Sequence, residues 1–306
     1  MSYSIYENIN DNPTSLVNAF IVPIQSSAFH WHNEYEMIGL LKGEITVRMQ
    51  SELISLKEGD ILFVNPNVIH SIQSVEGQDN LCMLIQMKVN LFAVEENEKK
   101  DILFYLDSTS DEVPECGFDF FFRRMAKILW ESMSDEKQAP FRTRAEVCTM
   151  IADLFEYVVY EERYKESKSK DRQDQAVLIM DYMVRNLCEE DVVDMACHEL
   201  GLSRKMLDRN LKLVLGFTGK ETINQLRIDE AKNLLKNTGK NMNYILDICG
   251  FGSEKTFYRL FRQETGLTPK KFREKGHYLS SNAELKDYLD FEVAEAKARL
   301  KQIIQE

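Results

Sequence analysis

An internal repeat in the last third of this 306-residue chain constrains its fold more than any other feature of the sequence. Residues 195–216 read MACHELGLSRKMLDRNLKLVLG, and residues 245–266 read ILDICGFGSEKTFYRLFRQETG. Both copies begin with an apolar pair, place a glycine five or six residues later, and continue as Ser-x-x-x-(Leu/Phe)-x-Arg-x-(Leu/Phe)-(Lys/Arg) before a terminal glycine. This order of residues predicts two copies of a helix-turn-helix unit.

Each shared feature of the repeat has a physical reason. Gly201 and Gly250 supply the positive φ or the close packing that the turn needs, and the Ser203 hydroxyl can cap the helix that follows. Apolar side chains four residues apart give each second helix one buried face. The predicted buried residues are Leu207, Leu211, Phe257 and Phe261. The opposite face carries Lys205, Asp208 and Arg209 in the first copy and Glu254, Lys255 and Arg259 in the second. A polar face of this size fits the major groove of DNA.

The segment between the two copies predicts a stiff connecting helix. Thr218 and Glu221 form a capping-box pattern that opens a helix through residues 226–235, and we expect this helix to act as a rigid spacer. After the second copy, Thr268 and Pro269 supply an N-cap and a first-turn proline for a further short helix. The basic residues of that short helix are Lys270, Lys271 and Arg273.

The net charge of −12 argues at first against a nucleic-acid partner, because DNA repels an acidic surface. However, the charge is unevenly distributed. Residues 1–164 carry 13 Lys and Arg against 27 Asp and Glu, whereas residues 175–276 carry 17 against 14. Within residues 253–275, seven basic residues stand against three acidic ones. The C-terminal region therefore offers a local basic face for phosphates.

From Tyr182 to Arg273 the sequence resembles the AraC/XylS family of bacterial transcription regulators. The stretches LRIDEAKNLLKNT and ICGFGSEKTFYRLFRQETGLTPKKFR are similar to the family signature nearly position by position. The resemblance implies that the second helix of each motif enters one of two successive major-groove segments, about 34 Å or one turn apart on bent double-stranded DNA. It implies base contacts from Lys205, Asp208, Arg209, Glu254, Lys255 and Arg259. It implies phosphate contacts from Ser203, Lys212, Ser253, Thr256, Arg262, Lys270 and Arg273.

Chemistry supports these base contacts unequally. Arginine and lysine donate to guanine O6 and N7, and glutamate accepts from the cytosine N4 amine. Asp208 repels phosphate unless a cytosine or a neighbouring arginine engages it, and the alternative is an intrahelical partner in Lys205 or Lys212. The first motif also departs from the family at Leu211, where an aromatic residue is common, and at Leu213, where a basic residue is common. We therefore expect the first motif to bind DNA more weakly than the second.

The front of the chain predicts an all-β domain. Between residues 20 and 88, short alternating runs are separated by turn residues at intervals of about ten, which is typical of an antiparallel barrel or sandwich. The clearest runs are Glu36–Leu41, Glu44–Met49 and Ile61–Val64, and a further strand-like run is Ile102–Leu106.

Over residues 118–133 and 141–164, apolar residues instead recur every three or four positions, which predicts two helices. The apolar faces of these two helices contain Phe121, Met125, Ile128, Leu129, Val147, Ile151, Leu154, Phe155 and Val158. These faces cap the barrel, form a homodimer interface, or do both. The polar segment 165–174 is the predicted linker, and residues 175–276 read as short helices. Residues 1–164 are thus the predicted sensor and dimerisation domain.

Four residues of the predicted barrel resemble metal-ligand positions of cupins. His30, His32 and Glu36, with His70 downstream, match the two cupin motifs as they occur in sensor domains of this regulator family. In metal-dependent cupins such positions supply three imidazoles and one carboxylate, a set suited to manganese, iron, nickel or zinc. The sequence departs from the cupin pattern at Ile24, Val68 and Ser74.

Three interpretations of His30, His32, Glu36 and His70 stay open. They line a pocket for a small-molecule effector such as a carbohydrate, they are ordinary hydrogen-bonded barrel histidines, or they bind a metal. We favour the effector pocket, and so predict no cofactor and no enzyme activity. The competing hypotheses are a metal-dependent cupin enzyme fused to a DNA-binding module and a regulator without an effector. The neighbouring Trp31 and Tyr35 either close over a ring-shaped ligand or pack in the barrel wall.

Residues 277–306 extend beyond the family signature and predict an amphipathic helix. Ser281 and Glu284 form a capping-box pattern. The apolar residues that follow at helical intervals are Leu285, Leu289, Val293, Ala296, Leu300 and Ile303. We expect this helix to dock on the DNA-binding domain, with pairing to another chain or to RNA polymerase as the alternatives.

The remaining features concern compartment and partners. The six cysteines are scattered without a C-x-x-C pair, which is typical of small buried groups in a reducing compartment. Near Met1 no basic start precedes an apolar run, and no stretch approaches the roughly 20 apolar residues of a membrane span. We therefore expect a cytoplasmic homodimer without a membrane partner, which contacts RNA polymerase if it activates transcription. The predicted fold class is a multidomain chain, with an all-β cupin-like barrel and helical segment before an all-α domain of two helix-turn-helix motifs.

Overall fold

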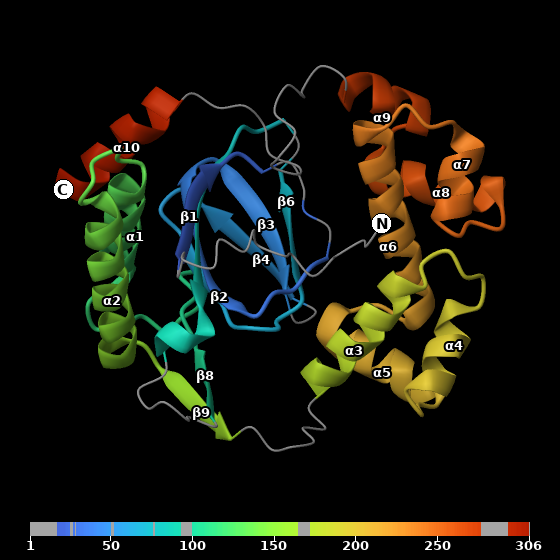
Figure 1. Ribbon diagram of the computed structural model, residues 1–306, viewed down its shortest axis with the longest axis horizontal. Coiled ribbons are helices and arrows are strands. Elements are labelled where there is room, and N and C mark those ends of the chain that lie inside the picture. The colour runs from blue at the N-terminus through green and yellow to red at the C-terminus, as the bar shows by residue number, and fades with distance from the viewer. Residues whose placement is uncertain are drawn as a thin grey trace.

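The barrel of the N-terminal domain is built from two antiparallel sheets that face each other (Figure 1). The computed structural model describes residues 17–24, 27, 29–49, 52–75, 77–92, 100–164, 172–276 and 293–305. The first sheet has the order β1 (Val17–Val22), β7 (Leu81–Lys88), β2 (Glu34–Lys42) and β5 (Ile61–Val64). The second has the order β4 (Glu52–Lys57), β3 (Glu44–Met49) and β6 (His70–Ser74). The predicted cupin-like, strand-rich domain is confirmed.

Strand β2 is buried on both of its faces, which explains its nearly continuous apolar sequence. Ile38 and Leu40 point into the space between the two sheets, where they pack with Ile45 and Val47 of β3. Met37 points the opposite way, toward the helices outside the four-stranded sheet. Successive residues of a strand face opposite sides, so β2 separates two hydrophobic cores.

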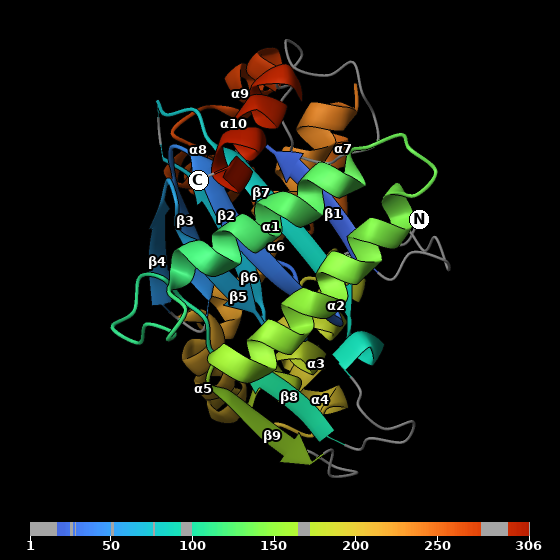
Figure 2. The ribbon, with the colours of Figure 1, turned by 90° about the vertical axis from the view of Figure 1, so that its left-hand side faces the viewer.

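Two helices cover the outer face of the four-stranded sheet (Figure 2). They are α1 (Phe118–Ser132) and α2 (Ala139–Tyr157), and they follow the short 3-10 helix η1 (Val89–Phe92) in the chain. Of the nine apolar residues predicted for their inner faces, all but the half-buried Phe155 are buried. These faces therefore cap the sheet, and a dimer interface on the same domain needs other residues.

The predicted helix over residues 141–164 is wrong at its C-terminal end. Helix α2 stops at Tyr157, and Val158 has the extended angles φ −107° and ψ 138°. Residues Tyr160–Tyr164 form β9, which pairs with β8 (Lys100–Phe104). The run Val158-Val159-Tyr160 consists of β-branched and aromatic residues, which favour a strand once a partner strand is available. That partner lies some 60 residues earlier in the chain, so local periodicity could not reveal it.

The C-terminal domain is all-α, with two halves joined by one long helix (Figure 1). The first half contains α3 (Arg172–Arg185), α4 (Val192–Glu199) and α5 (Arg204–Leu215), and the second contains α7 (Met242–Ile248), α8 (Glu254–Thr265) and α9 (Pro269–Gly276). The predicted spacer is α6 (Gly219–Asn237). Ile223 and Leu226 of α6 belong to the core of the first half, whereas Ala231 and Leu235 belong to that of the second. In the described part of the chain, no helix is both long and apolar enough to cross a membrane.

The C-terminal helix does not dock where the sequence predicted. Helix α10 (Val293–Gln305) packs against α1, on the side of the barrel away from the DNA-binding domain (Figure 1). Ala296 and Leu300 are fully buried in the core beneath α1. Arg299 fixes the helix by donating from Nη1 to the carbonyl oxygen of Leu41 at 3.0 Å. Amphipathic spacing predicts that a helix buries one face, but it does not identify the surface against which that face packs. The Ser281–Glu284 capping box lies outside the described residues.

We expect Leu300→Ala to lower the free energy of unfolding of the N-terminal domain by about 2 kcal/mol, because it leaves a cavity between α10 and α1. Urea unfolding followed by circular dichroism measures this change. Lys301→Ala, at the exposed neighbouring position, is the matched control. An unchanged unfolding midpoint for Leu300→Ala would contradict the position of α10 on the barrel domain.

Candidate DNA-binding and effector sites

Helices α5 and α8 are built alike, as the repeat predicted. Ser203 and Ser253 cap them, since each side chain accepts a hydrogen bond from the backbone N–H three residues later. Both helices end at a left-handed glycine, Gly216 with φ 79° and Gly266 with φ 68°. Local sequence signals therefore set the start and the end of each helix. We call α5 and α8 the reading helices.

The buried faces of the reading helices are also as predicted. Leu207, Leu211, Phe257 and Phe261 have no exposed surface. The Phe257 ring lies 5.4 Å from the Phe261 ring and 5.1 Å from that of Phe251, measured between centroids. These aromatic contacts fix the roll of α8 on its own half of the domain.

The turn before each reading helix needs its glycine. Gly201 has φ 64° and Gly250 has φ 68°, a region that other residues rarely adopt. A Cβ atom on Gly250 would also lie 2.5 Å from the carbonyl oxygen of Leu187. At Gly250, therefore, both predicted reasons, positive φ and close packing, apply at once.

The polar faces of the reading helices are open. Of the six residues predicted to contact bases, Asp208 is half-buried. The other five are exposed, namely Lys205, Arg209, Glu254, Lys255 and Arg259. Arg259 makes a long contact of 3.5 Å from Nη1 to Oε1 of Gln263, one turn further along α8. Nothing in the described residues covers these faces.

Asp208 already has partners within the protein. Its Oδ1 accepts a hydrogen bond from the backbone N–H of Gly219 at 2.7 Å, and its Oδ2 lies 3.6 Å from Nε of Arg204. The carboxylate therefore sits at the N-terminus of α6, where the helix dipole favours a negative charge. The intrahelical partner is Arg204, so neither Lys205 nor Lys212 takes the role suggested as the alternative to base contact.

We expect Asp208→Ala to lower the free energy of unfolding by about 1–2 kcal/mol, because the Gly219 N–H loses a charged acceptor. A base-reading aspartate would instead change which duplexes bind without changing stability. Thermal unfolding and duplex competition therefore distinguish the two roles. Asp194→Ala is a suitable control, since Asp194 is 73% exposed and pairs with the same arginine, Arg204.

The residues predicted to contact phosphates divide into free and engaged groups. Lys212, Arg262 and Lys270 are exposed on the helices that carry them. Ser203 and Ser253 act as N-caps, and Thr256 is half-buried on the first turn of α8. Arg273 donates from Nη2 to the carbonyl oxygen of Lys240 at 2.6 Å, which ties α9 to the segment after α6. The Arg273 guanidinium is therefore already engaged within the protein.

Sequence reasoning missed Arg227, which holds the domain together from within. Its Nε donates to the carbonyl oxygen of Leu187 at 3.1 Å, and its Nη2 donates to that of Glu189 at 2.6 Å. The guanidinium thereby fixes the connection between α3 and α4 to the middle of α6. The sequence signal that could have revealed this role is the position of Arg227 between two apolar residues, Leu226 and Ile228, which are both buried.

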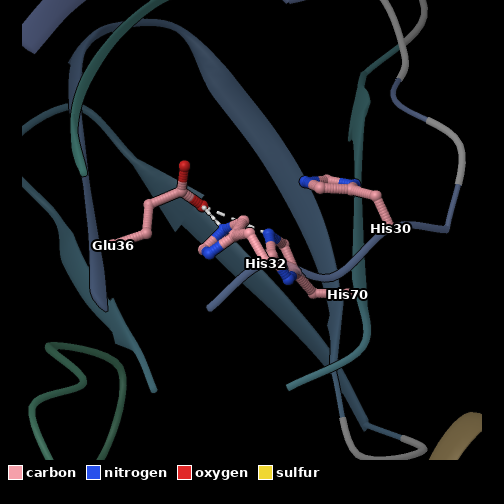
Figure 3. Close-up of side chains that lie close together, drawn as sticks. All are labelled: His30, His32, Glu36 and His70. Carbon is pink, nitrogen blue, oxygen red and sulfur yellow. Dashed lines mark hydrogen bonds and ion pairs between the residues drawn. The ribbon is translucent and has the colours of Figure 1, made fainter. Parts of the chain in front are cut away.

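In the barrel, the four predicted residues come together (Figure 3). One ligand atom from each of His30, His32, Glu36 and His70 lies within 4.8 Å of the others. Glu36, His32 and His70 are buried, and His30 is partly exposed. Residues from β2, β6 and the loop before β2 thus converge inside the barrel.

The hydrogen bonds orient this cluster toward one carboxylate. The Nδ1 atoms of His32 and His70 lie 3.0 and 2.9 Å from the backbone carbonyl oxygens of Glu34 and Val68, and a carbonyl can only accept. Their Nε2 atoms lie 3.6 and 3.1 Å from Oε2 of Glu36. Burial alone would raise the pKa of Glu36, but the hydrogen bonds and charges of His32 and His70 outweigh it and hold that pKa well below its usual value. Glu36 is therefore a buried carboxylate.

Trp31 and Tyr35 pack in the protein, which is the second of the two interpretations considered for them. The Tyr35 ring lies 4.0 Å from that of Phe92, and its hydroxyl donates to the carbonyl oxygen of Ile102 at 2.7 Å. Trp31 is 3% exposed and packs against the first half of the DNA-binding domain. Neither side chain closes over the histidine cluster.

Comparison with known proteins identifies both domains. A helix-turn-helix domain model matches residues 196–275, and a cupin domain model matches residues 20–86. The xylose operon regulatory protein of Haemophilus influenzae is 34% identical over 94 residues. The chain therefore joins a helix-turn-helix domain of the AraC type to a cupin domain that precedes it.

The extent of the similarity differs between the relatives. The match to the xylose regulator covers 31% of this chain and 24% of that protein, so the chain spans about a quarter of the relative's length. The probable transcriptional regulator LumQ of Photobacterium leiognathi is 22% identical over 250 residues, which is 81% of this chain and 93% of that protein. The crystal structure of ToxT from Vibrio cholerae O395 has 14% identity and a TM-score of 0.46, and covers 85% of this chain and 97% of that one.

Proposed function

We propose that this protein is a sequence-specific DNA-binding transcription regulator whose barrel binds a small-molecule effector. The observation that carries the proposal is the pair of open polar faces on α5 and α8, with Arg209 and Arg259 at the same position of the repeat. Each face stands opposite a fully buried apolar face, so the arginines are held at fixed positions on the domain surface. The single helix α6 joins the two halves and sets the distance between them.

On DNA, each reading helix enters the major groove and its arginine donates two hydrogen bonds to a guanine. Lys205, Lys255 and Glu254 contact neighbouring bases, while Lys212, Arg262 and Lys270 contact phosphates and set the register. The family resemblance supports two groove segments one helical turn apart.

The histidine cluster is the proposed effector site. Imidazole nitrogens, a carboxylate and the amide of Gln86, which donates to Oε1 of Glu36 at 2.9 Å, form hydrogen bonds of the kind that hydroxyl groups accept and donate. A carbohydrate is therefore the first effector class to test. The partly exposed His30 is the member of the cluster that solvent reaches.

Selection of bound duplexes from a random pool tests DNA recognition and yields the preferred binding sequence in the same experiment. The proposal predicts an enriched motif with two blocks about one turn apart, and an affinity that falls steeply with salt because cations contact phosphates. A thermal-shift screen with a panel of sugars tests the barrel, with Glu36→Gln as the matched control. Failure to enrich any motif would contradict the DNA-binding part.

Assembly and compartment belong to the same proposal. We propose that the protein is a cytoplasmic homodimer, that it contacts RNA polymerase if it activates transcription, and that it has no enzyme activity. The inner faces of α1 and α2 are used against the barrel, so we place the dimer interface on their outer surfaces, where Phe141 is 69% exposed. Sedimentation of the wild type and Phe141→Asp tests this interface.

A divalent metal in the histidine cluster is a second candidate, and the hydrogen-bond pattern favours it. Nδ1 of His32 and of His70 donates to a carbonyl, so a neutral ring would present the Nε2 lone pair to the Glu36 carboxylate. A proton or a cation between the two groups removes this repulsion. His30, His32, Glu36 and His70 would hold the ion, which would act as a Lewis acid. Metal analysis of the purified protein decides, since less than a tenth of an equivalent of any transition metal excludes a resident ion.

A further inference from the structure

Two short segments of the barrel form a paired ribbon beside the histidine cluster. The backbone N–H of His30 donates to the carbonyl oxygen of His70, and that of His70 to His30, both at 3.0 Å. The N–H of Asn67 donates to the carbonyl oxygen of His32 at 2.8 Å. We call residues 29–32 and 67–70 the histidine ribbon.

Neighbouring residues of the histidine ribbon face two different domains. His30, His32 and His70 belong to the cluster around Glu36. The residues between and beside them, Phe29, Trp31 and Ile69, are 5%, 3% and 0% exposed and belong to the hydrophobic core of the first helix-turn-helix half. Extended chains send successive side chains to opposite sides, so one backbone carries both sets.

The ribbon reaches the end of the first reading helix. The Phe29 ring packs edge-on against Phe217 at 5.9 Å between centroids, and Phe217 lies in the turn that joins α5 to α6. The guanidinium of Arg48 on β3 lies 5.2 Å from the same Phe217 ring. The barrel therefore contacts the DNA-binding domain at the turn that follows α5.

The second half of the DNA-binding domain lacks such a contact among the described residues. Its core contains residues of α6 to α9 and their turns, and none from the barrel. Through these apolar contacts, a movement of the histidine ribbon acts on the first half directly and reaches the second half through α6, which contributes residues to both cores.

We propose that the histidine ribbon couples occupancy of the cluster to the first reading helix, while α8 serves as a constant anchor on DNA. The proposal rests on the proposed function, because it takes the cluster as the effector site and the reading helices as the DNA contacts. A ligand that shifts the backbone at His30 and His32 also shifts Phe29 and Trp31, because they lie on the same short segment. The core that these two side chains enter is closely packed, so it adjusts in discrete steps rather than continuously. The effector thus modulates one groove segment and leaves the other bound.

A double-mutant cycle on the full chain tests this coupling and requires no effector. Affinity for the selected duplex is measured for the wild type, Glu36→Gln, Phe29→Ala and the double variant. We expect the double variant to depart at least about threefold from the product of the two single fold-changes, because the residues act through one backbone. Glu36→Gln combined with Phe122→Ala, a buried phenylalanine of α1, is the control and should multiply within experimental error.

The position of the effect is the second readout. Protection of guanine N7 from dimethyl sulfate should change in the groove segment contacted by α5 and stay constant in that contacted by α8. Phe29→Leu replaces Phe29→Ala if circular dichroism shows that the latter does not fold. Multiplicative fold-changes, or equal changes in both segments, would overturn the coupling. A wild-type protein that binds no duplex would instead reject the proposed function, so the two failures are distinguishable.

Discussion

Replacing Phe257 by alanine is expected to cost about 3–5 kcal/mol of the free energy of unfolding of the second helix-turn-helix half. Phe257 has no exposed surface and contacts the rings of Phe251, Tyr258 and Phe261. Its removal leaves a cavity where α8 packs, and the small core of this half has few residues to fill it. Urea unfolding followed by circular dichroism measures the loss, and the selected duplex should be bound much more weakly.

The matched control for this variant is Leu178→Ala. Leu178 is an apolar residue of the same domain that is 55% exposed, so its truncation should change stability by less than about 0.5 kcal/mol. Equal effects of the two substitutions would mean that α8 does not pack through Phe257 as described.

The double variant with Arg209→Ala and Arg259→Ala is expected to abolish sequence-specific binding while leaving the fold intact. Each exposed arginine that pairs with a guanine contributes about 1–3 kcal/mol, which is roughly 5- to 150-fold in affinity. The residual binding should be weak, insensitive to base sequence and dependent on salt, because phosphate contacts remain. Competition between the selected duplex and a shuffled one measures the lost discrimination.

A control that removes one exposed arginine outside the reading helices separates base reading from general electrostatics. Arg185 of α3 is 73% exposed and pairs with Asp181 of the same helix at 2.9 Å. Arg185→Ala should keep the discrimination between the selected and shuffled duplexes. The groove assignment is wrong if the arginine double variant also keeps it.

The sequence predicted those features that depend on neighbours along the chain. Ser203, Gly216 and the Thr218–Glu221 capping box lie where local hydrogen bonds alone decide the structure. The buried face of α8 follows from a four-residue spacing, whatever surface that face packs against. The convergence of the four barrel residues was predicted only from the cupin resemblance.

What the sequence did not predict depends on contacts between distant segments. Strand β9 exists because β8 lies beside it, and α10 packs on α1 although it follows the DNA-binding domain in the chain. The family resemblance implied that Asp208 contacts a base, yet its carboxylate accepts a hydrogen bond from a backbone N–H of α6. The contact of Phe29 and Trp31 with the helical domain was likewise invisible, because alternation shows that two faces exist and not which domain each one meets.

Protection of guanine N7 from dimethyl sulfate on the selected duplex tests the central claim most directly, since this atom lies in the major groove. The account predicts two protected clusters about one helical turn apart. Arg209→Ala should expose guanines in one cluster and Arg259→Ala should expose them in the other. A single protected cluster, or two variants that expose the same guanines, would contradict the claim that two reading helices occupy successive groove segments.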